Sequence, residues 1–328
     1  MSRTLEKIEA DKRRLPDWLR KDIAAGHEAP RTDALLKDLG LHTICESGRC
    51  PNRNECYSQK TATFMIMGDI CTRSCRFCSV STGRPEVLDV EEPVRVAQAA
   101  RTLGLQHVVV TSVNRDDLED EGVSHFVNVI RELKKISEDI IIEILTPDFK
   151  RTQRRAVRAI VESEPDIFNH NVETVPSLYK KVRPQGDYPK SLQIFREIKA
   201  ISNKVLTKSG LMLGLGEAKV EVLEVLNDLK SAGCDILTLG QYLQSSTLGL
   251  PVEEYIHPDV FSEYKKEAML MGFTWVESGP FVRSSFHAKD SFETLKASLK
   301  LHRHPRMFLS GIQAPGFPPK DCGNDIKD

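Results

Sequence analysis

Several features that would place the chain in a common non-enzymatic class are missing from its 328 residues. No segment approaches the roughly 20 consecutive apolar residues that a membrane-spanning helix needs. Residues 1–14 are charged from the start and contain no apolar core of a secretory signal. Lys and Arg number 46 against 47 Asp and Glu, a net charge of −1, so no positive field favours nucleic acid or a membrane surface. We therefore expect a cytoplasmic protein that binds neither.

Cysteine, by contrast, is concentrated in one part of the chain. Six of the eight cysteines fall between residues 45 and 78. With 40% hydrophobic and 28% charged residues, the chain has enough material for a core and needs no disulfide to stabilise it. Clustered thiols in a reducing compartment indicate metal binding rather than disulfides.

From residue 61 onward, short apolar runs alternate with segments of helical spacing. Residues 92–104 and 218–231 have such spacing, and Gly104 and Gly233 are typical of helix ends. Strands followed by helices predict a parallel sheet with right-handed crossovers. Six or seven units exceed a small doubly wound domain and fall short of an eight-fold barrel, so we expect an α/β fold with a partial (β/α)6-type barrel. The predicted strands are 64–67, 108–110, 140–145, 166–168, 211–213, 236–239 and 273–276.

Three segments are expected around this barrel. Residues 1–60 form an N-terminal extension with a short helix over 31–39, followed by a loop with three cysteines. Residues 61–282 form the barrel, and polar residues after each predicted strand place its working end at the carboxyl edge. Residues 283–328 form a C-terminal segment that folds back over the strand ends and continues into a tail that is partly disordered.

Directly after the first predicted strand, Cys71, Cys75 and Cys78 have the spacing C-x3-C-x2-C. Three thiolates from one tight loop can hold three irons of a 4Fe–4S cluster and leave the fourth iron open for chemistry. A structural zinc ion, the alternative, normally needs a fourth protein ligand.

A second triplet lies 15 residues upstream, where Cys45, Cys50 and Cys56 have the spacing C-x4-C-x5-C. A second cluster here would need a fourth ligand from elsewhere in the chain. Cys234 and Cys322 are the remaining thiols. Cys234 lies beside a buried run, where a free cysteine behaves as a small hydrophobe, and Cys322 lies in the tail, so neither is a compelling ligand.

The first cysteine motif resembles that of the radical S-adenosylmethionine enzymes, and the two triplets together resemble the lipoyl synthases within that superfamily. The resemblance covers roughly residues 35–290. One departure is Phe286, where the family usually has tyrosine. The matching segments are 41–45, 50–52, 61–65, 111–117, 146–149, 168–173, 207–210, 213–217, 238–242 and 279–285.

This resemblance implies a sulfurtransferase with two 4Fe–4S clusters and S-adenosylmethionine as cofactors. A 5′-deoxyadenosyl radical would abstract hydrogen at C6 and C8 of an octanoyl chain, and sulfide from the second cluster would replace it. The implied substrate is octanoyl-lysine on a lipoyl carrier, such as the glycine cleavage H protein or the E2 subunit of a 2-oxoacid dehydrogenase. A ferredoxin or flavodoxin would supply electrons, and an iron–sulfur carrier would rebuild the consumed cluster.

The resemblance also suggests roles for residues outside the cysteine motifs. The fourth ligand of the second cluster is expected to be Ser285, in preference to Ser284, since a serine oxygen can protonate and leave more readily than a thiolate. Helix or turn capping is the alternative for both serines. The expected contacts of S-adenosylmethionine, with a polar network at the barrel rim as the alternative, are Thr111, Ser112, Asp116, Asn169, Asn171, Glu173 and Lys208.

Other functions fit the sequence less well. Methylthiotransferases generally carry a longer N-terminal domain than the 44 residues before Cys45, and a biotin-synthase-like enzyme lacks the upstream triplet. A two-cluster electron carrier needs four protein ligands per cluster and would leave the β/α scaffold unexplained.

Overall fold

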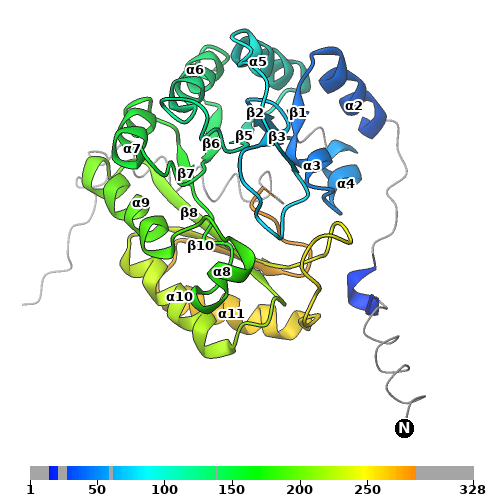
Figure 1. The fold of residues 1–328 in the computed structure, drawn as a ribbon, viewed down its shortest axis with the longest axis vertical. Coiled ribbons are helices and arrows are strands. Elements are labelled where there is room, and N and C mark those ends of the chain that lie inside the picture. The colour runs from blue at the N-terminus through cyan, green and yellow to red at the C-terminus, as the bar shows by residue number, and fades with distance from the viewer. Residues whose placement is uncertain (1–14, 21–27, 59–61, 138, 286–328) are drawn as a thin grey trace, which may run out of the picture.

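The computed structural model describes residues 15–20, 28–58, 62–137 and 139–285 (Figure 1). Phe286, Cys322 and the predicted tail lie outside the described residues.

The centre of the structure is a curved sheet in the order β1-β2-β5-β6-β7-β8-β9-β10. In the described part of the chain all neighbours are parallel except β1, which runs antiparallel to β2. The two ends of this order, β1 and β10, are not paired with each other, so the barrel is open and the predicted fold class is confirmed. The strands are β1 His42–Thr43, β2 Thr63–Ile66, β5 His107–Ser112, β6 Ile141–Leu145, β7 Ile167–Asn169, β8 Leu206–Leu213, β9 Ile236–Gln241 and β10 Trp275–Gly279.

Helices connect consecutive parallel strands and form an arc outside the sheet (Figure 1). Each is amphipathic; α7, for example, buries Ala156, Val157, Ile160 and Val161 against the sheet. Six strand–helix units are thus followed by β10, in agreement with the predicted (β/α)6 type. These helices are α5 Glu92–Leu103, α6 Val123–Lys134, α7 Gln153–Glu162, α9 Tyr188–Ile201, α10 Lys219–Ser231 and α11 Pro258–Leu270, with the short η2 Pro176–Leu178 and α8 Tyr179–Val182 before α9.

The N-terminal extension contains more regular structure than the predicted loop. Cys45 lies in α3 and Cys56 in α4, with Cys50 between them. The hydroxyl of Thr43 accepts a hydrogen bond from the Glu46 backbone N–H at 3.3 Å and so caps the start of α3, a signal that the sequence interpretation missed. The elements of this region are η1 Asp17–Leu19, α2 Glu28–Asp38, α3 Ile44–Ser47 and α4 Arg53–Ser58.

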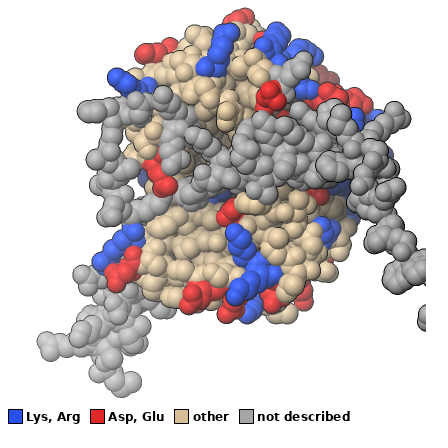
Figure 2. All heavy atoms as spheres, turned by 180° about the vertical axis from the view of Figure 1, so that it is seen from behind, with Lys and Arg blue, Asp and Glu red and all other residues tan. Residues whose placement is uncertain are grey.

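Two short parallel strands, β3 Ile70–Cys71 and β4 Ser81–Thr82, frame the downstream cysteines: Cys71 ends β3, and Cys75 and Cys78 lie in the loop between the strands. No helix among the described residues is long and apolar enough to cross a membrane. Figure 2 shows the face opposite that of Figure 1, where basic and acidic side chains are interspersed, in keeping with their nearly equal numbers.

Candidate functional site

A cavity of about 800 Å³ lies at the carboxyl ends of the strands, where polar residues were predicted to gather. The N-terminal extension, the loop between β3 and β4, the strand ends and the C-terminal segment all contribute to its wall. Cys45, Cys50, Cys71, Cys75 and Cys78 line it. Cys56 is half-buried on α4 and is not part of the lining. The structure therefore brings the whole downstream triplet and two of the three upstream cysteines to one cavity.

The loop that carries Cys71, Cys75 and Cys78 is fixed by a buried arginine. Arg73 donates from Nε and Nη2 to both carboxylate oxygens of Asp116, at 2.7 and 2.6 Å, and from Nη1 to Asp148 at 2.5 Å. Hydrogen bonding to Arg73 lowers the pKa of Asp116, so the pair stays charged. Asp116 follows β5 and Asp148 follows β6, so two strand ends hold the loop in place.

The cysteine side chains are free thiols, and both triplets have the donor chemistry of a 4Fe–4S site. Burial raises the pKa of Cys45 and of Cys75 to about 11, so each thiol would release a proton on binding iron. Across the described residues, no three His, Cys, Asp or Glu side chains are grouped as ligands of a single ion. A 4Fe–4S cluster instead binds each thiolate on a different iron and spans a wider space.

Four of the predicted S-adenosylmethionine contacts line this cavity: Thr111, Ser112, Asn171 and Glu173. The hydroxyl of Ser112 and Oδ1 of Asn171 are buried and have no hydrogen-bond partner among the residues that the structure describes, so both are available to a polar ligand. Glu173 adopts a left-handed backbone conformation with φ 69°, which is strained for a residue other than glycine. Burial raises the pKa of its carboxyl.

The other three predicted contacts do not line the cavity. Asp116 binds Arg73, as described above. Asn169 and Lys208 form a buried network with Glu143 instead: Asn169 Nδ2 donates to Glu143 at 2.9 Å, and Lys208 Nζ lies 2.8 and 3.1 Å from its two oxygens. Although burial acts to raise it, the pKa of Glu143 is lowered to about 2 by the charge of Lys208 and a hydrogen bond with His107.

The C-terminal segment folds back against the cysteine-bearing extension, as predicted up to Ser285. Asn52, in the second cysteine motif, donates to the carbonyl of Phe281 at 2.7 Å. Thr63 Oγ1 donates to Ser285 Oγ at 2.6 Å, and Ser285 and Cys45 line the same cavity.

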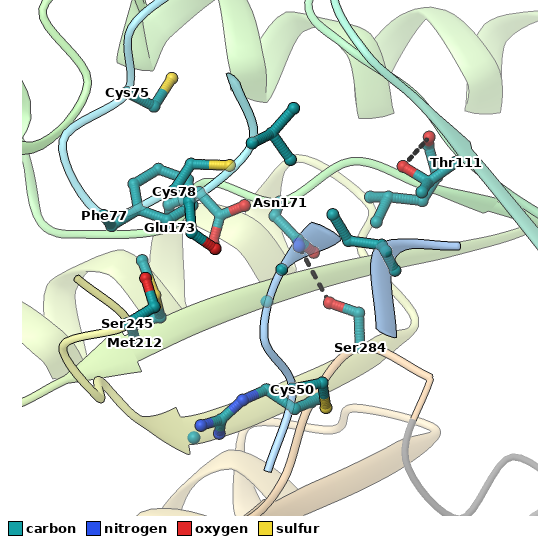
Figure 3. A pocket seen from close by; sticks show the side chains of 18 of the residues that line it. Cys50, Cys75, Phe77, Cys78, Thr111, Asn171, Glu173, Met212, Ser245 and Ser284 are labelled. Carbon is teal, nitrogen blue, oxygen red and sulfur yellow. Dashed lines mark hydrogen bonds between the residues drawn. The ribbon is translucent and has the colours of Figure 1, made fainter. Parts of the chain in front are cut away.

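Ser284 is oriented differently from Ser285 and accepts from Asn171 Nδ2 at 2.9 Å. In Figure 3, Cys75 and Cys78 lie toward one end of the cavity, and Cys50 and Ser284 lie toward the other. Cys234 is buried away from this lining, and its thiol donates to the Ile236 carbonyl at 3.3 Å, so it is not placed to act as a fourth ligand.

Arg73, Asp148 and Arg183 were not among the predicted site residues. Arg73 lies inside the first cysteine motif and Asp148 follows a predicted strand, so their positions in the sequence could have identified them as site residues. Arg183 follows α8, lines the cavity and donates to the Asn171 carbonyl at 2.9 Å. No pattern in the sequence distinguishes it from a surface arginine.

Comparison with solved structures supports the fold described here. The FeFe-hydrogenase maturase HydG from Carboxydothermus hydrogenoformans aligns with a TM-score of 0.53 and 15% identity, over 90% of this chain and 72% of that one. Methylornithine synthase aligns with a TM-score of 0.50 and 14% identity, over 81% and 92%. At such low identity the likeness concerns the fold alone.

Sequence comparisons are more specific. The profile of the radical SAM superfamily matches residues 65–236, and that of the N-terminal domain of lipoyl synthase matches residues 2–50. The lipoyl synthase of Caldanaerobacter subterraneus subsp. tengcongensis is 52% identical over 84% of this chain and 96% of its own length. That of Pseudomonas fluorescens is 50% identical over 87% and 83%. With a cavity that gathers cysteines from two separate motifs, the chain belongs to the lipoyl synthase family of radical S-adenosylmethionine enzymes.

Proposed function

We propose that this enzyme inserts sulfur at C6 and C8 of an octanoyl chain that is amide-linked to a lysine of a lipoyl carrier protein. The observation that carries the proposal is that cysteines of both triplets line one cavity together with Ser285. A radical generator and a sulfur source can then reach the same bound chain. The carrier, a ferredoxin or flavodoxin as reductant, and an iron–sulfur carrier for cluster repair are the proposed partners, and the cytoplasm is the proposed location.

Each part of the cavity wall has a proposed role. Cys71, Cys75 and Cys78 hold the first cluster, and the four cavity-lining contacts Thr111, Ser112, Asn171 and Glu173 bind S-adenosylmethionine. When bound, these groups supply the radical chemistry and the second cluster supplies sulfide. The second cluster is held by Cys45, Cys50, Cys56 and Ser285. We also propose the division into an extension of residues 1–60, a barrel of 61–282 and a C-terminal segment of 283–328.

The apolar part of the wall suits an acyl chain. Ile44, Met65, Val109, Val113 and Leu145 all line the cavity, and they come from the extension and from neighbouring strands. These side chains would bind the methylenes by removing them from water and would exclude water from the reacting carbons. The polar residues on the same wall would then orient the cofactor rather than the chain.

The test separates the two cysteine triplets. The anaerobically reconstituted protein should bind about eight irons as two clusters of four. Replacing Cys71, Cys75 and Cys78 with alanine should leave about four irons and abolish 5′-deoxyadenosine formation under reduction. Replacing Cys45, Cys50 and Cys56 should also leave about four irons but keep 5′-deoxyadenosine formation while abolishing sulfur insertion into an octanoyl-lysine peptide, read by mass.

Replacing the buried Cys234 with alanine is a matched control, because this thiol lies outside the cavity lining and should affect neither reaction. Loss of the same partial reaction in both triple variants would contradict the proposed division of labour. About four irons in the unmodified protein would rule out a second cluster.

A further inference from the structure

The segment that carries Ser285 has no regular secondary structure to hold it. The last described strand of the chain, β10, ends at Gly279, and residues 280–285 after it belong to neither helix nor strand. A buried carbonyl without a partner is costly, and here side chains donate to the carbonyls of Phe281 and Ser284. The side chains that meet it come from the extension and from the interior of the barrel.

Lys208 is the charged member of this set. It is 7% exposed on β8, and its ammonium contacts three acceptors: both carboxylate oxygens of Glu143 and the backbone carbonyl of Ser284. An ammonium has three N–H donors, so this set uses its full capacity. Glu143 is fully buried on β6 and supplies the opposite charge across the intervening strand β7.

The segment packs closely against the barrel wall. A side chain at Gly240 on β9 would collide with the carbonyl of Val282, so the segment lies directly on the strand. Asn171 donates a hydrogen bond to the Ser284 hydroxyl, which the dashed line in Figure 3 marks. Ser284 is thus held through its backbone and its side chain, and Ser285 is the next residue along.

From these contacts we propose that Lys208, with Glu143 as its counter-ion, is a positioning residue that holds Ser285 at the second cluster site. The inference rests on the proposed function, in which Ser285 is a ligand of that cluster. Lys208 itself does not line the cavity and touches no proposed ligand side chain. Its effect passes through the Ser284 carbonyl to the adjoining residue.

The experiment measures how fast a chelator removes iron from the second cluster. The full chain carries Cys71, Cys75 and Cys78 changed to alanine, so that only this cluster is counted. Glu143→Gln keeps the ammonium, whereas Glu143→Gln with Lys208→Met removes it without leaving a buried carboxylate unpaired. We expect iron loss to be roughly tenfold faster in the second variant than in the first, as loss of one hydrogen bond from a charged donor implies.

Two further variants separate positioning from a general loss of stability. Lys199→Met removes an ion pair with Asp235 at the opposite ends of the strands and should leave the rate of iron loss unchanged. Ser285→Ala should raise that rate, and adding Glu143→Gln with Lys208→Met to it should raise it no further, because both changes remove the same ligand.

The outcomes distinguish this inference from the proposal on which it rests. Unchanged iron loss in Ser285→Ala would overturn the serine ligand and the positioning role together. Faster loss in Ser285→Ala with no effect of Lys208→Met would overturn only the positioning role. Additive effects of the two changes, or an equal effect of Lys199→Met, would show that Lys208 acts on overall stability instead.

Discussion

Ser285 differs from the other proposed ligands of the second cluster because its donor atom is oxygen. The structure places this hydroxyl 2.6 Å from Thr63 Oγ1, and Ser285 lines the same cavity as Cys45 and Cys50 of the extension. An alkoxide binds iron less durably than a thiolate does and can leave once protonated. The iron held by this weaker serine ligand could then dissociate from the cluster after a neighbouring sulfide has bonded to carbon.

We therefore predict that Ser285→Cys retains a full second cluster but slows sulfur insertion, on the order of 10- to 100-fold. Iron content and the mass of the octanoyl-lysine product measure the two effects separately. Ser284→Cys is the control, since the Ser284 hydroxyl is bonded to Asn171 instead. Turnover at the unmodified rate in Ser285→Cys would contradict the ligand assignment.

The Glu143 carboxyl is buried with Lys208, and its pKa is lowered to about 2. Because the folded pKa is below the ordinary value of 4.5, the ionised group stabilises the fold above about pH 4.5, and this contribution is lost as pH falls toward 2. We predict that Glu143→Gln lowers the free energy of unfolding by about 3 kcal/mol near neutral pH.

That difference should shrink between about pH 4.5 and pH 2, because the native carboxyl is then protonated as well. Urea unfolding of the iron-free chain at several pH values measures it. Glu263→Gln, which removes an exposed ion pair with Lys219, should leave the free energy of unfolding nearly unchanged, because solvent screens that pair. A pH-independent difference for Glu143→Gln would show that its charge does not stabilise the fold.

The loop between β3 and β4 depends on Arg73 for its shape as much as on its cysteines for its chemistry. Arg73 lies between Cys71 and Cys75 in the sequence. Its guanidinium binds the carboxylates of Asp116 and Asp148, which follow β5 and β6. Without it, Asp116 would keep the Thr72 hydroxyl at 2.8 Å and Asp148 would keep Arg183 at 3.8 Å, but neither of these contacts would join the two carboxylates to the loop through one side chain. The loop would then no longer be held in the conformation that turns its thiols into the cavity.

We predict that Arg73→Leu lowers iron bound by the first cluster to less than about half, because outer contacts of a metal site commonly change affinity 10- to 100-fold. Iron is counted in a chain with Cys45, Cys50 and Cys56 changed to alanine. Arg95→Leu removes a more exposed pair with Asp89 and serves as the control. Full iron loading in Arg73→Leu would show that the cysteines alone determine the loop.

Across the whole molecule, the cavity joins elements that lie far apart in the sequence. Residues 44, 45 and 48–51 of the extension, the strand ends from β2 to β9 and residues 282–285 all line it. Apolar side chains such as Met65 and Val109 share this wall with the cysteines. An acyl chain bound there would lie within reach of both cluster sites.

We predict that the enzyme discriminates strongly by chain length. Each buried CH2 contributes about 0.8 kcal/mol, so an octanoyl peptide should bind with a Kd lower than that of a butanoyl peptide on the order of 100-fold. A butanoyl chain has no C6 or C8 to react, so the measurement is the Kd of peptides with four, six and eight carbons rather than their turnover. Equal Kd values for all three peptides would show that the apolar wall does not bind the chain.

The sequence alone predicted the open barrel and the two cysteine triplets. Strands such as β5 and β9 contain short, mostly apolar runs without alternating polar positions, because parallel strands covered on both sides have no polar face. Cysteine spacing was equally informative, since one tight loop can supply three thiolates without any distant partner. The extension was harder to predict: α3 and α4 are too short for an apolar period to stand out.

What only the tertiary structure decided is which polar residues face the cavity and which serve the scaffold. Asn171 and Glu173 line it, whereas Asn169 and Lys208, on neighbouring strands, are bound to Glu143 within the barrel. Lys208 and Glu143 are 65 positions apart, and Arg73 and Asp148 are 75 apart. The local sequence pattern reveals that a residue follows a strand. Whether a buried charged residue faces the cavity or belongs to the scaffold depends on the ion-pair partner that it binds. Only the folded sheet brings those two residues together.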